Sequence, residues 1–167
     1  MNIILIGMPL SGKTTIGRRI SEKLSIQHID LDEEIERAFG ESIYELFLRF
    51  GESHFREIEN EYFKKIDLVG PSIVSIGGGA ANSLNSEIIS LYQNRIWLQC
   101  SAKRAISRYQ GLTAKRPLLH NTTNLIDKWC ELYEKRKIFF KNLSNIIIDT
   151  SDLDINGSAE KVIMEMI

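Results

Sequence analysis

The sequence has few cysteines and prolines and lacks any long apolar run. Cys100 and Cys130 are too few and too isolated for a disulfide framework or a metal-binding knuckle, so we interpret them as buried, reduced thiols. No apolar run approaches the ~20 residues of a membrane-spanning helix. The first residues have the pattern of a core strand, not of a signal peptide. A reducing cytoplasm is therefore the expected compartment, and no membrane partner is predicted.

An excess of charge of either sign is also lacking, since 21 Lys and Arg residues face 22 Asp and Glu residues. A strongly basic balance would favour nucleic acid or an anionic membrane as partner, and neither is predicted here. A small anionic ligand remains compatible, because a few Arg and Lys side chains can gather locally within a balanced total. At 167 residues, 43% of them hydrophobic, the chain predicts one domain with a buried core over residues 1–167.

Short apolar strands alternate with helical patterns along the whole chain. Strands are expected at residues 2–6, 26–29, 73–76, 95–100 and 145–149. Helices are expected at residues 13–24, 33–39, 42–65 (broken near Gly51), 86–92, 102–109, 124–143 and 158–167. The alternation predicts an α/β fold, a three-layer α/β/α sandwich on a mostly parallel five-stranded sheet. Residues 110–120 contain Gly111 and the dipeptide Arg116-Pro117, and are expected to form a loop.

The turn after the first strand reads GMPLSGKT at residues 7–14 and satisfies the pattern G-x-x-x-x-G-K-[ST]. Gly7 and Gly12 allow close approach of the main chain. Its N–H groups then converge on phosphate oxygens at the start of a helix, where the dipole also favours negative charge. Lys13 brings a cation to the β and γ phosphates, and the Thr14 hydroxyl is a suitable ligand for Mg²⁺. The segment is therefore predicted to be a phosphate-binding loop (P-loop).

Two acidic residues follow the second strand. Asp30 and Asp32 lie at its carboxyl end, which is the edge of an open α/β sheet where ligands bind. Residues at i and i+2 near a strand end can contact two neighbouring points of a ligand. Asp30 could hold the Mg²⁺ shell, and Asp32 could hold the acceptor hydroxyl. Asp32 is also a good N-cap for a helix that starts at Glu33, so a capping role remains open.

Two further segments favour a small anionic acceptor. Arg56 and Glu59 share one face of a helix and can pair, either as an exposed salt bridge or as an Arg fork that Glu59 orients toward a ligand carboxylate. Residues 77–79 are three adjacent glycines after a buried strand, which is more than an ordinary turn requires. We expect a ligand to lie against their main-chain N–H groups, with a plain flexible turn as the alternative.

The order and approximate spacing of these motifs resemble those of the shikimate kinases over essentially the whole chain. The motifs are the P-loop, D-x-D at 30–32, G-E-x-x-F-R-x-x-E at 51–59, the triple glycine and R-P-L-L at 116–119. The resemblance implies a P-loop NTPase fold like that of the NMP kinases, a mobile lid at about 110–120 and acceptor-binding helices at about 33–65. It implies transfer of the γ-phosphoryl of ATP to the 3-hydroxyl of shikimate, toward chorismate and the aromatic amino acids. It further implies a requirement for Mg²⁺, a cytoplasmic enzyme and a monomer.

The resemblance also assigns roles to residues. Lys13, Asp32 and Arg116 would be catalytic, with Asp32 as the candidate base and Arg116 reaching the transferring phosphate when the lid closes. Thr14 would bind Mg²⁺ directly, and Asp30 would bind it through water. The ATP contacts would be Gly7, Ser11, Gly12, Lys13, Thr14, Arg108, Asp149 and Thr150. The shikimate contacts would be Asp32, Phe47, Phe55, Arg56, Gly77, Gly78, Gly79 and Arg136.

Other P-loop proteins remain alternatives. A gluconate kinase or a nucleoside monophosphate kinase would share the phosphate cradle and a lid. A non-catalytic, nucleotide-dependent binding module would be expected to lack the acceptor Asp or the lid Arg, and the sequence has both Asp32 and Arg116. Leu10 departs from many kinases, which have a third glycine at its position in the loop.

Overall fold

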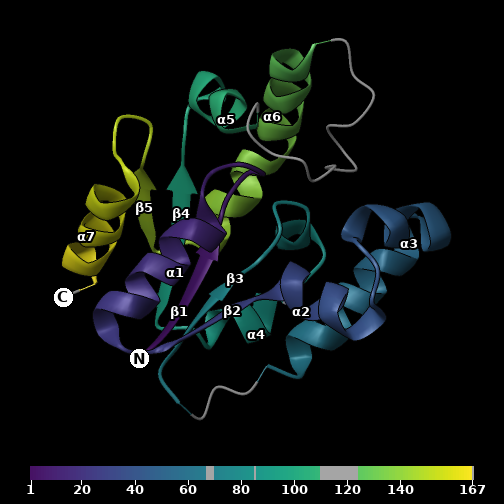
Figure 1. Ribbon diagram of the computed structural model, residues 1–167, viewed down its shortest axis with the longest axis horizontal. Coiled ribbons are helices and arrows are strands. Elements are labelled where there is room, and N and C mark those ends of the chain that lie inside the picture. The colour runs from purple at the N-terminus through teal and green to yellow at the C-terminus, as the bar shows by residue number, and fades with distance from the viewer. Residues whose placement is uncertain (67–69, 85, 110–123, 167) are drawn as a thin grey trace.

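The computed structural model describes residues 1–66, 70–84, 86–109 and 124–166, and it contains all the predicted strands and helices (Figure 1). The strands are β1 (Asn2–Ile6), β2 (Gln27–Asp30), β3 (Ser72–Ser75), β4 (Asn94–Gln99) and β5 (Ile146–Asp149). The helices are α1 (Lys13–Leu24), α2 (Leu31–Phe39), α3 (Ile43–Lys64), α4 (Ser86–Ser90), α5 (Ala102–Tyr109), α6 (Leu125–Leu143) and α7 (Ile155–Glu165). A short 3-10 helix at Ala80–Asn82 was not predicted.

The five strands form one sheet in the order β2-β3-β1-β4-β5, and every pair is parallel. Alternate residues of β1 belong to two separate apolar cores, because side chains of a strand point to opposite faces. Ile3 and Leu5 pack with residues of α1 and α7, whereas Ile4 and Ile6 pack with residues of α2, α3 and α6. Figure 1 shows α1 and α7 together on one side of the sheet. The predicted three-layer sandwich is confirmed.

The parallel sheet brings the predicted motifs to one edge. The P-loop follows β1, Asp30 ends β2, and the triple glycine at 77–79 follows β3 shortly after its last residue. Since β2, β3 and β1 are neighbours in that order, these segments lie side by side at the carboxyl edge of the sheet.

Several local predictions can be compared with the structure. Helix α3 does break at Gly51, which has φ 76° and ψ 166° and separates two helical stretches. Helix α7 begins three residues earlier than predicted, because the Asp154 side chain accepts a hydrogen bond from the Gly157 N–H and caps it. Cys130 is exposed, so its prediction as a buried thiol is wrong, whereas Cys100 is buried. No helix among the described residues is both long and apolar enough to cross a bilayer.

Candidate active site

A cavity of about 530 Å³ lies at the carboxyl edge of the sheet. Its walls come from the P-loop, the segments after β2 and β3, and helices α1, α3, α5, α6 and α7. The predicted site residues that line it are Gly12, Lys13, Thr14, Asp30, Asp32, Phe47, Phe55, Arg56, Gly77, Gly78, Gly79, Arg108 and Arg136. Arg116 and the predicted lid at about 110–120 lie outside the described residues.

The P-loop has the backbone that its glycines predict. Gly12 has φ 96° and precedes α1 without a side-chain cap, so the first N–H groups of α1 face the loop. The Lys13 ammonium donates hydrogen bonds to the carbonyl oxygens of Gly7 and Met8, at 3.0 and 2.9 Å. Leu10 has φ 69°, a left-handed conformation that costs an ordinary residue roughly 1 kcal/mol. Its buried side chain packs in the core and offsets that cost.

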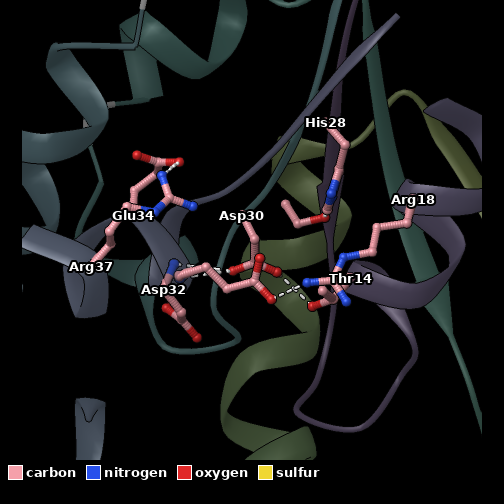
Figure 2. Close-up of polar contacts among 9 residues, drawn as sticks. Thr14, Arg18, His28, Asp30, Asp32, Glu34 and Arg37 are labelled. Carbon is pink, nitrogen blue, oxygen red and sulfur yellow. Dashed lines mark hydrogen bonds and ion pairs between the residues drawn. The ribbon is translucent and has the colours of Figure 1, made fainter. Parts of the chain in front are cut away.

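Thr14 and Asp30 meet directly, as Figure 2 shows. The Thr14 hydroxyl donates to Asp30 Oδ2 at 2.5 Å, while Asp30 Oδ1 accepts from the main-chain N–H groups of Asp32 and Glu33. Asp30 is therefore the N-cap of α2, and the alternative that Asp32 caps this helix is wrong. The capping frees the Asp32 side chain from that role, and it lines the cavity instead.

The Thr14–Asp30 pair fits the donor set of a magnesium site. Both side chains offer hard oxygens at one point of the cavity wall. Mg²⁺ in nucleotide sites is held by one or two protein oxygens together with phosphate oxygens and waters. The described residues contain no cluster of three His, Cys, Asp or Glu side chains that would form an all-protein cage. The two oxygens of Thr14 and Asp30 suit a metal that arrives with a nucleotide.

In another part of the cavity wall, Arg56 is fixed by two carboxylates and two aromatic rings. Its Nη1 donates to Glu59 Oε2 at 2.5 Å, and its Nη2 donates to Glu52 Oε1 at 3.1 Å. The guanidinium carbon lies 5.3 Å from the ring centre of Phe47 and 5.6 Å from that of Phe55. Glu59 is only 1% exposed, so the reading of this pair as an exposed salt bridge is wrong. The carboxylates and the aromatic rings together hold the Arg56 guanidinium in one position.

Arg136 is a second guanidinium in the same wall. It is 5% exposed, and its Nη1 has no hydrogen-bond partner among the described residues. Burial, and then the positive charge of Arg56, lower the pKa of Arg136 from its ordinary value. A buried cation with an unpaired donor beside a second cation favours an anion between them.

Glu59 is a buried carboxyl group with unusual proton affinity. Burial raises its pKa to about 7; the ion pair and hydrogen bond with Arg56 oppose this shift, the nearby Asp32 adds to it, and Arg136 also opposes it. The same pairing with Glu59 outweighs the effect of burial on Arg56, whose pKa is raised. Arg56 thus stays charged, while Glu59 exchanges its proton near neutral pH.

The raised pKa of Glu59 predicts a pH-dependent difference between the wild type and Glu59→Gln. The stability that the protonated carboxyl contributes is complete below the unfolded pKa of 4.5 and is lost as pH rises through about 7. Relative to the non-titrating Gln variant, the wild type should lose roughly 2–3 kcal/mol of unfolding free energy between pH 5 and pH 8. Urea unfolding of both proteins at the two pH values measures this, and a constant difference would contradict it.

The triple glycine is explained by space, because none of the three has a positive φ. A Cβ on Gly77 would lie 3.1 Å from Asp32 Oδ1, and one on Gly79 would overlap the Arg56 guanidinium. A Cβ on Gly78 would lie 2.7 Å from the Pro9 ring and 2.9 Å from the Gly7 carbonyl oxygen. These glycines let the segment after β3 fit between the P-loop and the Asp32 and Arg56 side chains. The alternative of a plain flexible turn is not supported.

Not every predicted nucleotide contact lies at the cavity. Asp149 accepts hydrogen bonds from the N–H and hydroxyl of Ser151, and the buried Thr150 hydroxyl donates to the Gln99 carbonyl oxygen. Both residues build the turn between β5 and α7. Gly7 and Ser11 support the loop without lining the cavity. Arg108 does line it and donates to the Leu10 carbonyl oxygen at 3.1 Å.

Several residues of the cavity wall were not predicted from the sequence. Ile155 and Ser158 of α7 line it next to α1, and the Ser158 hydroxyl is buried without a partner among the described residues. Arg18 of α1 and Glu33 of α2 form an ion pair beside Thr14. No local pattern marks these residues, since each depends on how α1, α2 and α7 pack.

A family model, curated relatives and a solved structure that are similar to this chain share one description. The model of a family described as shikimate kinase matches residues 9–167. A shikimate kinase of Thermodesulfovibrio yellowstonii is 35% identical over 98% of this chain and 94% of that protein. One of Bacillus pumilus is 35% identical over 97% and 87%. The solved structure of shikimate kinase from Acinetobacter baumannii in complex with shikimate is similar with a TM-score of 0.91, at 28% identity over 99% of this chain and 92% of that one.

Proposed function

This chain belongs to the shikimate kinase family, and from that premise we propose that it transfers the γ-phosphoryl group of ATP to the 3-hydroxyl of shikimate. The products would be ADP and shikimate 3-phosphate, on the route to chorismate and the aromatic amino acids. One observation carries the proposal. The P-loop, the half-buried Arg56 and the buried Arg136 line the same cavity, so it offers cationic groups to a triphosphate and to a small carboxylate at once.

On the donor side, the N–H groups at the start of α1 and the Lys13 ammonium would hold the phosphates. Thr14, directly, and Asp30, through water, would hold Mg²⁺, which supplies charge neutralisation at the phosphates when bound. Arg108 and the half-exposed Ile155 line the cavity where α5 and α7 approach the P-loop, and we propose that the nucleotide base lies there. Arg116 remains the predicted lid residue.

On the acceptor side, Arg56 and Arg136 would bind the shikimate carboxylate, and the Gly77–79 segment would contact ring hydroxyls. Phe47 and Phe55 have ring centres 4.5 Å apart and would form an apolar wall beside the ring. Asp32 would accept the proton of the 3-hydroxyl while the oxygen forms a bond to the γ-phosphorus and the bond to the β-phosphate oxygen breaks. Phosphoryl transfer depends mainly on this positioning and on charge stabilisation.

We propose further that the protein acts as a monomer in the cytoplasm and that residues 1–167 form one domain. The single sheet shared by both apolar cores supports the single domain.

An ADP-release assay tests the proposed function. Purified protein with ATP and Mg²⁺ should release ADP much faster when shikimate is added, and gluconate or a nucleoside monophosphate should have little effect. Stimulation by gluconate in place of shikimate would identify a sugar-acid kinase instead. ATP binding without stimulation by any acceptor would identify a non-catalytic binding module.

Arg56→Lys should raise the KM for shikimate roughly ten- to a hundredfold, because a lysine keeps the charge but loses the planar fork. The KM for ATP should change little. Arg49→Lys is the matched control, since Arg49 lies on the same helix, pairs with Glu41 and contacts the Phe50 ring, but does not line the cavity. An unchanged KM for shikimate in Arg56→Lys would show that Arg56 does not bind the acceptor.

A further inference from the structure

The two tryptophans of the chain differ in what their indole N–H groups contact. Both are buried, Trp129 at 2% and Trp97 at 4% exposure, and both pack against Tyr133. The Trp129 N–H donates to the Pro9 carbonyl oxygen at 3.0 Å. The Trp97 N–H has no partner among the described residues. The bond from Trp129 therefore joins α6 to the P-loop, 120 positions earlier in the chain.

Pro9 is held on its other side by the triple-glycine segment. A Cβ on Gly78 would lie 2.7 Å from the Pro9 ring and 3.1 Å from the Pro9 nitrogen, so the two main chains are in tight contact. Proline donates no main-chain hydrogen bond. Its carbonyl oxygen and its ring are thus the two points at which neighbouring segments fix this part of the P-loop.

Helix α6 also carries Arg136, seven residues after Trp129. That spacing is two helical turns, so both side chains leave α6 on the same face, and both are buried. Trp129 is held against the helix by Tyr133, with the two rings nearly parallel at 9° and their centres 5.5 Å apart. One rigid helix thus contacts the phosphate cradle at one point and provides the acceptor guanidinium at the other.

We infer that Trp129 is a positioning residue, whose indole N–H holds the P-loop against the helix that carries Arg136 and so fixes the separation of donor and acceptor. The inference rests on the proposed phosphoryl transfer. Small displacements of reacting groups cost much of the rate in such reactions. Loss of the bond should therefore loosen the cradle and lower kcat, even though Trp129 itself does not line the cavity.

Trp129→Phe tests the inference, because it keeps an aromatic ring against Tyr133 and removes the N–H. Binding of ADP in the presence of Mg²⁺, measured by calorimetry, should weaken roughly two- to tenfold, as expected for one hydrogen bond. The kcat at saturating ATP and shikimate should also fall. Trp97→Phe is the matched control, with the same loss of ring volume and no lost partner, and its ADP affinity and kcat should equal those of the wild type.

A second measurement leaves Trp129 intact. In Trp97→Phe, Trp129 is the only tryptophan, and its fluorescence emission should change as ADP and Mg²⁺ fill the site. The midpoint of this change should fall at the ADP concentration that calorimetry gives for half-saturation. The emission of Trp97 in Trp129→Phe should stay constant. If Trp129→Phe does not fold, the fluorescence titration of Trp97→Phe tests the inference by itself. Trp129 emission that does not change on addition of ADP and Mg²⁺ would overturn the inference.

The outcomes separate the inference from the proposed function. A wild type that binds no ADP, or that turns over no shikimate, would overturn the function. A wild type that does both, together with a folded Trp129→Phe of equal ADP affinity and kcat, would overturn only the positioning role. A purely structural role would lower the urea midpoint of Trp129→Phe and leave both quantities unchanged.

Discussion

Replacing Lys13 by alanine should lower kcat on the order of a thousandfold, leaving turnover near the limit of detection. The Lys13 ammonium lies over the P-loop, bonded to the carbonyl oxygens of Gly7 and Met8, and lines the cavity. In phosphoryl transfer the developing charge spreads over the phosphate oxygens, and a fixed cation at that point stabilises the transition state more than the ground state. Such an effect is larger in a site that excludes water than in bulk solution.

The measurement is steady-state ADP release with both substrates saturating. Lys23→Ala provides a matched control, because Lys23 lies in the last turn of the same helix and pairs with Glu160 on the surface. That variant should retain wild-type kcat. Activity of Lys13→Ala within tenfold of the wild type would remove the P-loop cation from the mechanism.

The strands and the α-helices could be predicted from the sequence because each of them has a clear local signal. Continuous apolar runs such as residues 2–6 predict buried parallel strands, and the apolar spacing of α6 predicts its full length. Gly51 predicted the break in α3, since its φ of 76° is unfavourable for other residues. Local chemistry alone decides these features, so one sequence suffices to predict them.

Two predictions that proved wrong are the capping role of Asp32 and the burial of Cys130. In both cases the local sequence allows two outcomes, and packing decides between them. Asp32 suited the N-cap of a helix starting at Glu33, whereas α2 starts at Leu31 and its first N–H groups donate to Asp30. Cys130 directly follows the buried Trp129, but a helix turns by about 100° per residue, which points Cys130 toward solvent. Neither outcome has a signature in the sequence of its own segment.

The site was predicted best where a motif supplies several groups at once. Gly12, Lys13 and Thr14 of the P-loop, together with Arg56 and the triple glycine, line one cavity. The nucleotide contact of Thr150 stays a prediction; its hydroxyl donates to the Gln99 carbonyl oxygen, while Ile155 and Ser158 of the next helix line the cavity. A loop after a strand predicts only the neighbourhood of a ligand, because the direction of each side chain depends on the turn that the loop adopts.

Asp32→Asn should lower kcat by roughly 10²–10⁴-fold while the affinity for ATP stays close to that of the wild type. Asp32 lies in the first turn of α2, where the helix dipole favours a carboxylate, and its Oδ1 lies near Gly77 on the proposed acceptor side of the cavity. An amide of the same shape keeps the contacts but accepts no proton. The loss should therefore fall on the chemical step, with a smaller effect on the KM for shikimate.

The neighbouring carboxylates make this prediction specific. Asp30 is committed to Thr14 and to the helix cap, and Glu59 is committed to Arg56, so neither can replace Asp32 without breaking a bond. Glu34→Gln is the matched control on the same helix, since Glu34 pairs with Arg37 on the surface (Figure 2) and does not line the cavity. Weakened ATP binding in Asp32→Asn that depends on Mg²⁺ concentration would assign Asp32 to the metal. If the kcat of Asp32→Asn equalled that of Glu34→Gln, Asp32 would not be the base. The acceptor hydroxyl would then lose its proton to solvent, and charge stabilisation at the phosphates would account for the catalysis.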